Sequence, residues 1–286
     1  MTLGLAERWI NTRLAQVITT VTGAIHNYRL DLAAQAVYDF TWDDYCDWYL
    51  ELSKTTLTHT AATEAQQRGT LYTLVQVLEQ LLRLLHPFIP FITEELWRRV
   101  SPVAGKGGNT IMLQPYPDAA LVPRHPDSVP VLDWVKAFIL GVRRIRAERD
   151  IAPGKPLPVS IKGGNDQERG WLREHRNYLC TLAKITEITM LERAPDDAVM
   201  ALAGDMTILV PLAELIDLDA ERERLRREHV KLDKLVSAYR AKLGNENFIA
   251  RAPAEVINKE RGKMAEAEAA LVTISREIER IEKLRK

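Results

Sequence analysis

The sequence predicts a mainly α fold in three parts. We expect an antiparallel helical bundle over residues 1–117, a connector and a small α+β subdomain over residues 118–213, and a C-terminal antiparallel α-helical coiled-coil hairpin over residues 214–286. Three observations support this division. Apolar residues recur three and four positions apart in the first part, short alternating segments with Gly-rich turns follow, and a seven-residue repeat runs through the last part.

The first part contains the pattern of long amphipathic helices. One apolar stripe runs through residues 14–25 and another through residues 71–85. The two prolines of the HPFIP motif (residues 86–90) cannot lie inside a regular helix, so the motif should end the second of these helices. Asp31 and Thr93 are oxygen-bearing side chains at helix starts, and we expect each to be an N-cap.

Aromatic residues are concentrated in the motif FTWDDYCDWYLELSK (residues 40–54). Its acidic residues alternate with aromatic ones, which predicts a helix with an aromatic core face and a solvated acidic face rather than a catalytic carboxylate pair. We expect Trp42, Trp48, Phe88 and Trp97 to be core residues of the bundle and not platforms for stacked bases. Replacing Trp48 with alanine should then cost roughly 3–5 kcal/mol.

The middle of the chain begins with a connector rich in Gly and Pro (residues 101–130). Within it, residues 110–114 should form an extended segment against the bundle. Two amphipathic helices are expected over residues 134–149 and 171–183. The expected strands cover residues 156–162, 185–191, 199–203 and 207–210.

The last part has the pattern of a coiled coil. Leu218, Leu225, Leu232 and Tyr239 repeat every seven residues, and apolar residues alternate three and four apart over residues 264–281. Two such seams joined by a short loop predict an antiparallel hairpin. Helices of roughly 25 residues would reach about 40 Å.

Charge is distributed unevenly along a neutral chain. The whole sequence has 39 basic and 39 acidic residues, whereas residues 218–286 have 17 basic and 13 acidic ones. This leaves 22 basic and 26 acidic residues elsewhere, so the last part has a net charge of +4 and the rest −4. A local basic surface can hold a nucleic acid without a basic overall charge.

Other features limit the cellular setting and the chemistry. Cys46 and Cys180 lie far apart in apolar segments, which favours buried thiols in a reducing cytoplasm. No apolar run is long enough to span a bilayer, and we expect a cytoplasmic monomer. The GKGG sequence (residues 105–108) lacks Walker spacing, and the six histidines lack metal-ligand spacing. We therefore expect no catalytic residues, no metal site and no cofactor in this chain.

Three motifs resemble one family. HPFIPFITEELW (residues 86–97) and FTWDDYCDWYLELSK are similar to the helical anticodon-binding domain of class Ia aminoacyl-tRNA synthetases. LGNENFIARAPAEV (residues 243–256), between two heptad helices, resembles the C-terminal arm of bacterial valyl-tRNA synthetases. The resemblance implies a tRNA-binding C-terminal portion whose partner is tRNA(Val). The parent enzyme attaches valine using ATP and Mg²⁺. HIGH-like and KMSKS-like signatures are absent, so we expect no aminoacylation or valine-dependent ATP–pyrophosphate exchange from this chain alone.

Basic side chains are the candidates for RNA contact, since Arg and Lys bind phosphates and Arg also recognises bases. Those in the bundle are Arg8, Arg13, Arg29 and Lys54. Those in the arm are Arg240, Lys242, Arg251, Lys259, Arg261 and Lys263, with Lys231 and Lys234 nearby. A further run, Arg143, Arg144, Arg146, Arg149 and Lys155, is expected to pair with nearby acids.

Two alternatives remain open from the sequence. The chain could be a standalone interaction protein whose coiled coil binds a protein partner. It could also be the corresponding part of an isoleucyl-type synthetase, although two isolated cysteines argue against the Cys-rich zinc module that commonly ends those enzymes. Salt-sensitive binding of tRNA in a gel shift would favour the synthetase reading, and salt-insensitive self-association would favour the interaction protein.

Overall fold

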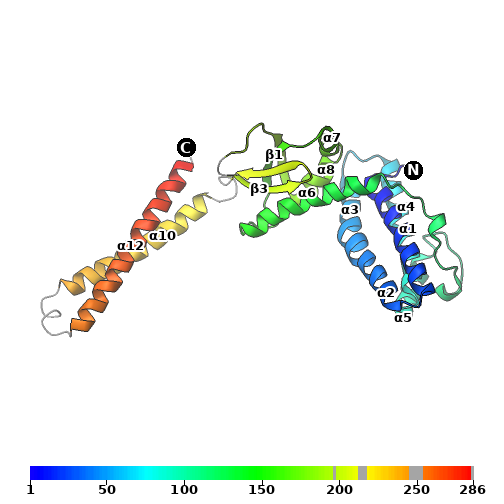
Figure 1. Cartoon of the computed structure of the whole chain (residues 1–286), viewed down its shortest axis with the longest axis horizontal. Coiled ribbons are helices and arrows are strands. Elements are labelled where there is room, and N and C mark those ends of the chain that lie inside the picture. Colours follow the sequence, from blue (N-terminus) through cyan, green and yellow to red (C-terminus); the bar gives the residue numbers. More distant parts are fainter. Residues whose placement is uncertain (196–197, 212–217, 245–253, 285–286) are drawn as a thin grey trace. The chain divides into compact units, whose positions relative to one another are not determined.

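The computed structural model describes residues 1–195, 198–211, 218–244 and 254–284 (Figure 1). It confirms the mainly α fold with a small four-stranded mixed sheet. The chain forms two compact units, one of residues 1–194 and 200–209, the other of residues 195–199 and 210–286. The bundle and most of the α+β subdomain thus share the first unit, and the boundary at residues 117/118 stays a prediction.

The bundle is built around its first helix, α1. Trp9, Ile10, Leu14 and Ile18 on α1 are buried, because their spacing of three and four places them on a single face. The helical segments of the bundle are α1 (Leu5–His26), α2 (Leu30–Asp39), η1 (Phe40–Tyr49), α3 (Leu50–Thr58), α4 (Glu64–Leu85) and α5 (Pro90–Val100).

The two predicted N-caps are both wrong. Helix α2 begins at Leu30, so Asp31 lies in its first turn, where its carboxylate accepts from the Arg29 guanidinium. Helix α5 begins at Pro90, whose fixed φ suits the first helical position, and the Thr93 hydroxyl donates to the Ile89 carbonyl instead of capping. The HPFIP motif does end α4, as predicted, at Leu85.

The aromatic motif forms a π-helix, η1, between α2 and α3. Hydrogen bonds from residue i to i+5 widen each turn, so side chains four or five apart share a face. Phe40, Tyr45 and Tyr49 are therefore buried, whereas Trp42 is 53% exposed. The prediction that Trp42 is a core residue is wrong because it assumed ordinary α-helical periodicity through this segment.

The connector crosses the bundle with two 3-10 turns, η2 (Ile111–Leu113) and η3 (Ala119–Leu121). The prediction of an extended segment over residues 110–114 is therefore wrong. The Thr110 hydroxyl accepts from the Met112 N–H at 3.3 Å and favours a turn. The turn does lie on the bundle, because Ile111 packs with Leu82 and Trp97.

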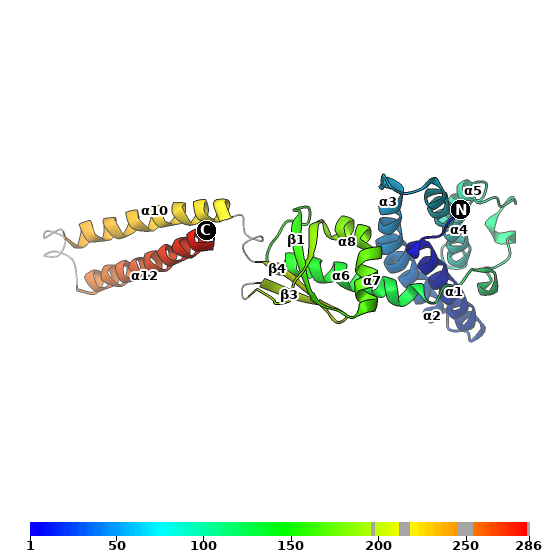
Figure 2. The ribbon, with the colours of Figure 1, turned by 90° about the horizontal axis from the view of Figure 1, so that it is seen from above.

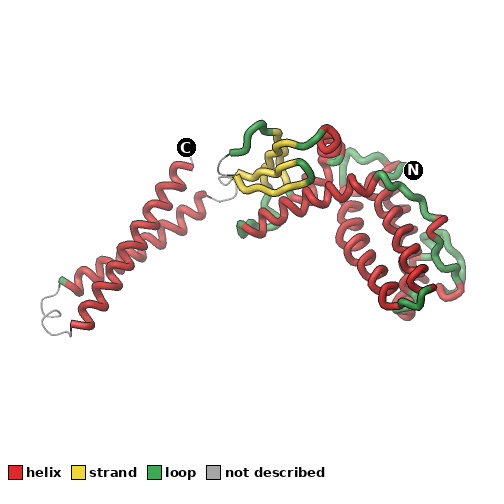
Figure 3. The backbone as a smooth tube through the Cα atoms, viewed as in Figure 1, coloured by secondary structure: helices red, strands yellow, loops and turns green. Residues whose placement is uncertain are grey.

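The α+β subdomain places its sheet on helix α6 (Figure 3). The strand order is β2-β1-β4-β3, with β1 parallel to β2 and antiparallel to β4. Gly141 on α6 permits close packing, since a Cβ there would lie 3.1 Å from Ile208 Cδ1 and 3.2 Å from Ala201 Cβ. Helices α6 and α8 also pack against α1 and α3 of the bundle. The bounds are α6 (Ser128–Glu148), β1 (Leu157–Gly163), α7 (Asp166–Glu174), α8 (Arg176–Ala183), β2 (Ile185–Met190), β3 (Ala198–Ala203) and β4 (Met206–Pro211).

The expected helix over residues 171–183 is interrupted. It is the end of α7 followed by α8, and the break falls at His175. The buried imidazole of His175 stacks with the Tyr178 ring at 6.3 Å between centroids. The break therefore directs a histidine towards the bundle side of the subdomain, where burial lowers its pKa.

The arm is an antiparallel helical hairpin, as predicted. Helices α10 (Leu218–Leu243) and α12 (Ala254–Leu284) run side by side (Figure 2). Leu225 and Ile274 are buried between them, with Leu232 and Ile278 packed against this pair. At a rise of about 1.5 Å per residue, α10 is about 39 Å long.

Candidate nucleic-acid interface

One end of the bundle exposes aromatic and aliphatic side chains. The turn from α1 to α2 places Tyr28 and Leu30 there, and the turn from α4 to α5 places Phe88, Ile89 and Phe91 there. We call this surface the aromatic end. Tyr28 is 93% exposed and Phe91 is 91% exposed. Single exposed apolar residues are ordinary, but two almost bare aromatic rings on adjoining turns point to a binding surface.

Tyr28 adopts a backbone conformation that is uncommon for a residue with a side chain. Its φ is +56°, in the left-handed region. The N–H groups of Tyr28 and Arg29 donate to the carbonyls of Ile25 and Ala24, at 3.0 and 2.8 Å, and hold this turn. The tight turn thus keeps an exposed aromatic ring on a backbone fixed by α1, and such conformations concentrate at functional sites.

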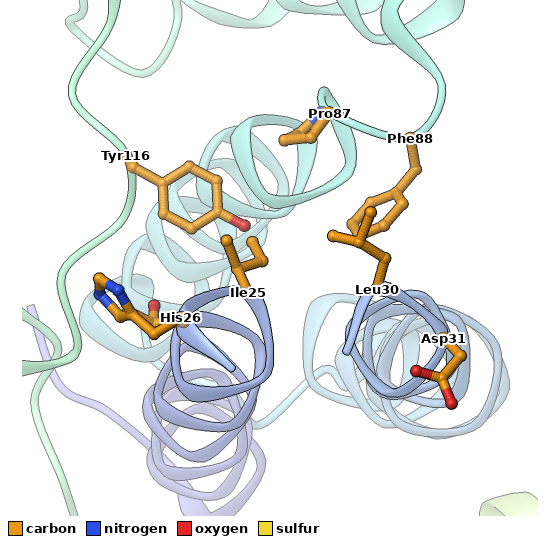
Figure 4. A pocket seen from close by; sticks show the side chains of 8 residues that line it. Ile25, His26, Leu30, Asp31, Pro87, Phe88 and Tyr116 are labelled. Carbon is orange, nitrogen blue, oxygen red and sulfur yellow. The ribbon is translucent and has the colours of Figure 1, made fainter. Parts of the chain in front are cut away.

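A pocket of about 820 Å³ opens beside this surface (Figure 4). In this view Leu30 and Phe88 lie on one side of it, and Tyr116 of the connector lines the opposite side. Burial raises the pKa of Tyr116 to about 12, so its hydroxyl stays protonated at neutral pH, and it donates to the Leu84 carbonyl at 3.5 Å. The complete lining is Thr22, Ile25, His26, Leu30, Asp31, Pro87, Phe88 and Tyr116. An apolar pocket with a few polar groups suits a planar, partly polar ligand such as a nucleobase.

All four basic residues predicted for the bundle pair with carboxylates. The distances are 3.3 Å for Arg8–Asp127, 2.7 Å for Arg13–Asp44, 2.7 Å for Arg29–Asp31 and 2.6 Å for Lys54–Glu51. Of these residues, Arg29 follows Tyr28 directly, and its partner Asp31 lines the pocket. The structure therefore brings Arg29 to the aromatic end, and the other three lie on other parts of the bundle.

Arg13 belongs to a separate charged cluster. Its partner Asp44 is buried, and the Lys136 ammonium lies 4.0 Å from the other Asp44 oxygen. Burial raises the pKa of Asp44, while Arg13 and Lys136 oppose that rise. Lys136 also lies 5.1 Å from the centre of the Trp48 ring. This cluster ties η1 to α1 and α6, which gives Arg13 a structural role.

The remaining predicted core aromatics differ from one another. Trp97 is fully buried, as predicted. Trp48 is only half-buried, and its ring contacts the Lys136 ammonium and the Arg143 guanidinium, which lie 5.1 and 5.8 Å from its centre. Phe88 is also half-buried and lines the pocket. The prediction that Trp48 and Phe88 are core residues is therefore wrong.

The basic run on α6 mostly avoids carboxylates. Arg146 is buried and donates to the carbonyls of Ala152, Lys155, Ala183 and Lys184 at 2.6–3.3 Å. Two of these carbonyls belong to the C-terminal end of α8, where the helix leaves acceptors without partners. The prediction of acidic partners is wrong for Arg146 and holds for Arg144, which lies 3.6 Å from Glu148.

In the arm, the predicted basic residues fall into two groups. Arg240 pairs with Glu268 at 2.7 Å, and Lys242 and Lys263 share Glu260 at 3.0 and 3.4 Å. Lys259 and Arg261 are exposed and pair with no carboxylate in the described part of the arm. Arg251 lies outside the described residues.

Other kinds of site find no support in the described ranges. There, no three His, Cys, Asp or Glu side chains gather in a way that could bind a metal ion. Among the same residues, no helix combines the length and the apolarity needed to cross a bilayer.

Tyr28 and Phe91 were not among the residues predicted to contact RNA. Both follow apolar stripes, and an aromatic residue after a stripe is usually buried. One signal was available, because Asn27 and Pro90, residues typical of helix ends and starts, lie next to them and place each ring at a helix terminus.

Two family models match this chain. The model of the anticodon-binding domain of tRNA ligases matches residues 7–161, which contain the bundle, its aromatic end and helix α6. The model of the valyl-tRNA synthetase tRNA-binding arm matches residues 217–283, the hairpin of α10 and α12. The chain therefore belongs to the tRNA ligase anticodon-binding family and, with its arm, is the tRNA-binding C-terminal portion of a valyl-tRNA synthetase.

Proposed function

We propose that this portion binds tRNA(Val) as a monomer, with the anticodon loop on the aromatic end of the bundle and the body of the tRNA on the arm. It needs no cofactor of its own, and ATP and Mg²⁺ serve the catalytic domain of the parent enzyme. It acts in the cytoplasm, a setting supported by the two free cysteines, Cys46 and Cys180.

The observation that carries the proposal is the exposure of Tyr28 and Phe91 beside an apolar pocket. Proteins recognise single-stranded RNA loops by stacking unpaired bases on aromatic side chains and by hydrogen bonding to base edges. The two bare rings provide the stacking surfaces. The pocket provides room for a base, and the Tyr116 ring provides a further aromatic wall.

Arg29 completes this surface. Its side-chain hydrogen bonds lower the pKa of Asp31 to about 2, so Asp31 remains ionised at neutral pH. Both side chains are more than half exposed, and exposed ion pairs contribute little to stability, typically about 0–1 kcal/mol. Arg29 can therefore exchange Asp31 for an RNA phosphate at small cost.

Alanine substitution of Tyr28 and of Phe91 tests the proposal. Loss of one base–aromatic stack costs about 1–3 kcal/mol, so each variant should bind tRNA(Val) roughly 5- to 150-fold more weakly. The matched control is Tyr72→Ala, which removes a 52% exposed aromatic residue from the middle of α4. Fluorescence anisotropy with labelled tRNA(Val) at fixed salt gives the affinities, and a tRNA with a changed anticodon reports specificity.

The outcomes separate the proposal from its alternatives. Equal affinities for Tyr28→Ala, Phe91→Ala and Tyr72→Ala would move the anticodon site away from the aromatic end. Concentration-dependent self-association in sedimentation velocity, without salt-sensitive tRNA binding, would instead support a coiled-coil interaction protein.

A further inference from the structure

The two helices of the arm differ in the charge of the surface that each turns away from the other. Successive residues of an α-helix are rotated by about 100°. On α10, the buried seam contains Leu225 and Val236, with Leu232 beside them. Arg227, Lys231 and Lys234 lie about 120–180° from this seam and are all exposed. We call these three residues the α10 stripe.

The charges of the α10 stripe are only partly compensated. Arg227 lies 3.4 Å from Glu223, one turn earlier on the same face. Lys231 and Lys234 pair with no carboxylate in the described part of the arm, and Asp233 lies to the side of the stripe. The outward surface of α10 thus has three cations and one carboxylate among its described side chains.

The outward surface of α12 is different. Its seam contains Ala267 and Ile274, and the described charged residues on the opposite side are Arg261, Glu266, Arg276 and Glu279. These two positive and two negative charges cancel. The exposed residues near the centre of this surface are Asn258, Gly262, Ala265 and Ala269. The hairpin is therefore basic on the outer side of one helix and neutral on the outer side of the other.

We propose that the outer face of α10, through Arg227, Lys231 and Lys234, binds the phosphate backbone of the tRNA body, and that the outer face of α12 points away from it. This inference rests on the proposed function and adds to it the face of the arm that contacts the RNA. Cations on successive turns of a rigid helix suit the regularly spaced phosphates of double-stranded RNA, which proteins recognise mainly by shape and backbone contacts. The contact adds affinity without reading sequence.

A matched pair of charge insertions tests which outer face of the arm contacts the RNA. Ala238 lies on the same outer face as the α10 stripe, one turn after Lys234. Ala269 lies at the centre of the outer face of α12. Both are exposed alanines inside helices, so Ala238→Glu and Ala269→Glu carry the same intrinsic cost of helix formation. Circular dichroism at 222 nm should show equal helicity for the two variants.

Affinity for a tRNA(Val) transcript is then measured on the full chain between 0.05 and 0.3 M KCl, roughly the range in which phosphate contacts are salt-sensitive. Each phosphate contact contributes about −0.9 to the slope of log K against log salt, equivalent to about eightfold in affinity at 0.1 M relative to 1 M. Ala238→Glu should weaken binding about tenfold at 0.1 M KCl, and Ala269→Glu should leave it within about twofold.

A loss-of-charge variant provides a second measurement. Lys231→Gln combined with Lys234→Gln should reduce the salt slope by about 2 and weaken binding at 0.1 M KCl by about 60-fold. Equal effects of Ala238→Glu and Ala269→Glu, or an unchanged slope in the double variant, would overturn the assignment of the α10 face while leaving tRNA binding intact. Failure of the unmodified chain to bind tRNA would instead refute the proposed function itself.

Discussion

Replacing Trp97 with alanine tests how α5 is held on α4. The Trp97 ring is 0% exposed and packs with Leu82 and Ile111. Its Nε1–H donates to the buried Glu79 carboxylate at 2.9 Å, and the other Glu79 oxygen accepts from Arg83 at 2.7 Å. Arg83 in turn donates to the Pro115 carbonyl at 2.7 Å, so one network joins α4, α5 and the connector.

The expected magnitude follows from these contacts. Removing a fully buried Trp side chain costs about 3–5 kcal/mol, and leaving one Glu79 oxygen without a donor adds about 1 kcal/mol, because Arg83 still binds the other oxygen. Trp97→Ala should therefore destabilise the first unit by about 4–6 kcal/mol. Trp48→Ala should cost only about 1–2 kcal/mol, less than its sequence suggested, since its ring is half-buried under two cations. Trp42→Ala should cost under about 1 kcal/mol.

Urea denaturation followed by tryptophan fluorescence measures these differences. All six tryptophans lie in residues 1–194, so the signal reports the first unit and not the arm. The order of destabilisation should be Trp97, Trp48, Trp42. A Trp42 variant as unstable as the Trp97 variant would refute the reasoning, because it would show that exposure does not determine the contribution of these rings.

Three further outcomes are expected. Arg146→Met should destabilise the first unit by about 3–5 kcal/mol in the same urea assay, because four carbonyls lose a buried donor, whereas Arg144→Met should change stability by under about 0.5 kcal/mol. Burial lowers the pKa of His175 below 6.5, so the folded state resists its protonation. The stability of the protein should therefore be greatest above pH 6.5 and fall as the pH is lowered to 5.5. Thermal melts of the His175→Gln variant should show a smaller fall over the same pH range. Deleting residues 218–286 should weaken tRNA(Val) binding and flatten its salt dependence without changing anticodon preference, and anisotropy titrations with wild-type and anticodon-altered tRNA can contradict this.

The sequence alone determined most of the helices and strands, and the family. The end of α4 follows from the prolines of HPFIP, the hairpin follows from the heptads at Leu225 and Leu232, and three motifs indicate a valyl-tRNA synthetase. These features depend on local backbone chemistry and on periodicity, both of which are properties of a short stretch of chain.

The tertiary structure alone decided which side chains are available for RNA. The sequence presents Arg13 and Arg29 as equivalent basic residues, but long-range packing gives Arg13 the buried Asp44 and leaves Arg29 beside an exposed Tyr28. The π-helical turn shifts Trp42 into solvent. Arg146 is buried because Ala183 and Lys184, which are distant in the sequence, supply two of its acceptors. Charge, aromatic character and helix phase are local properties, whereas partner, burial and exposure depend on segments brought together only when the chain folds.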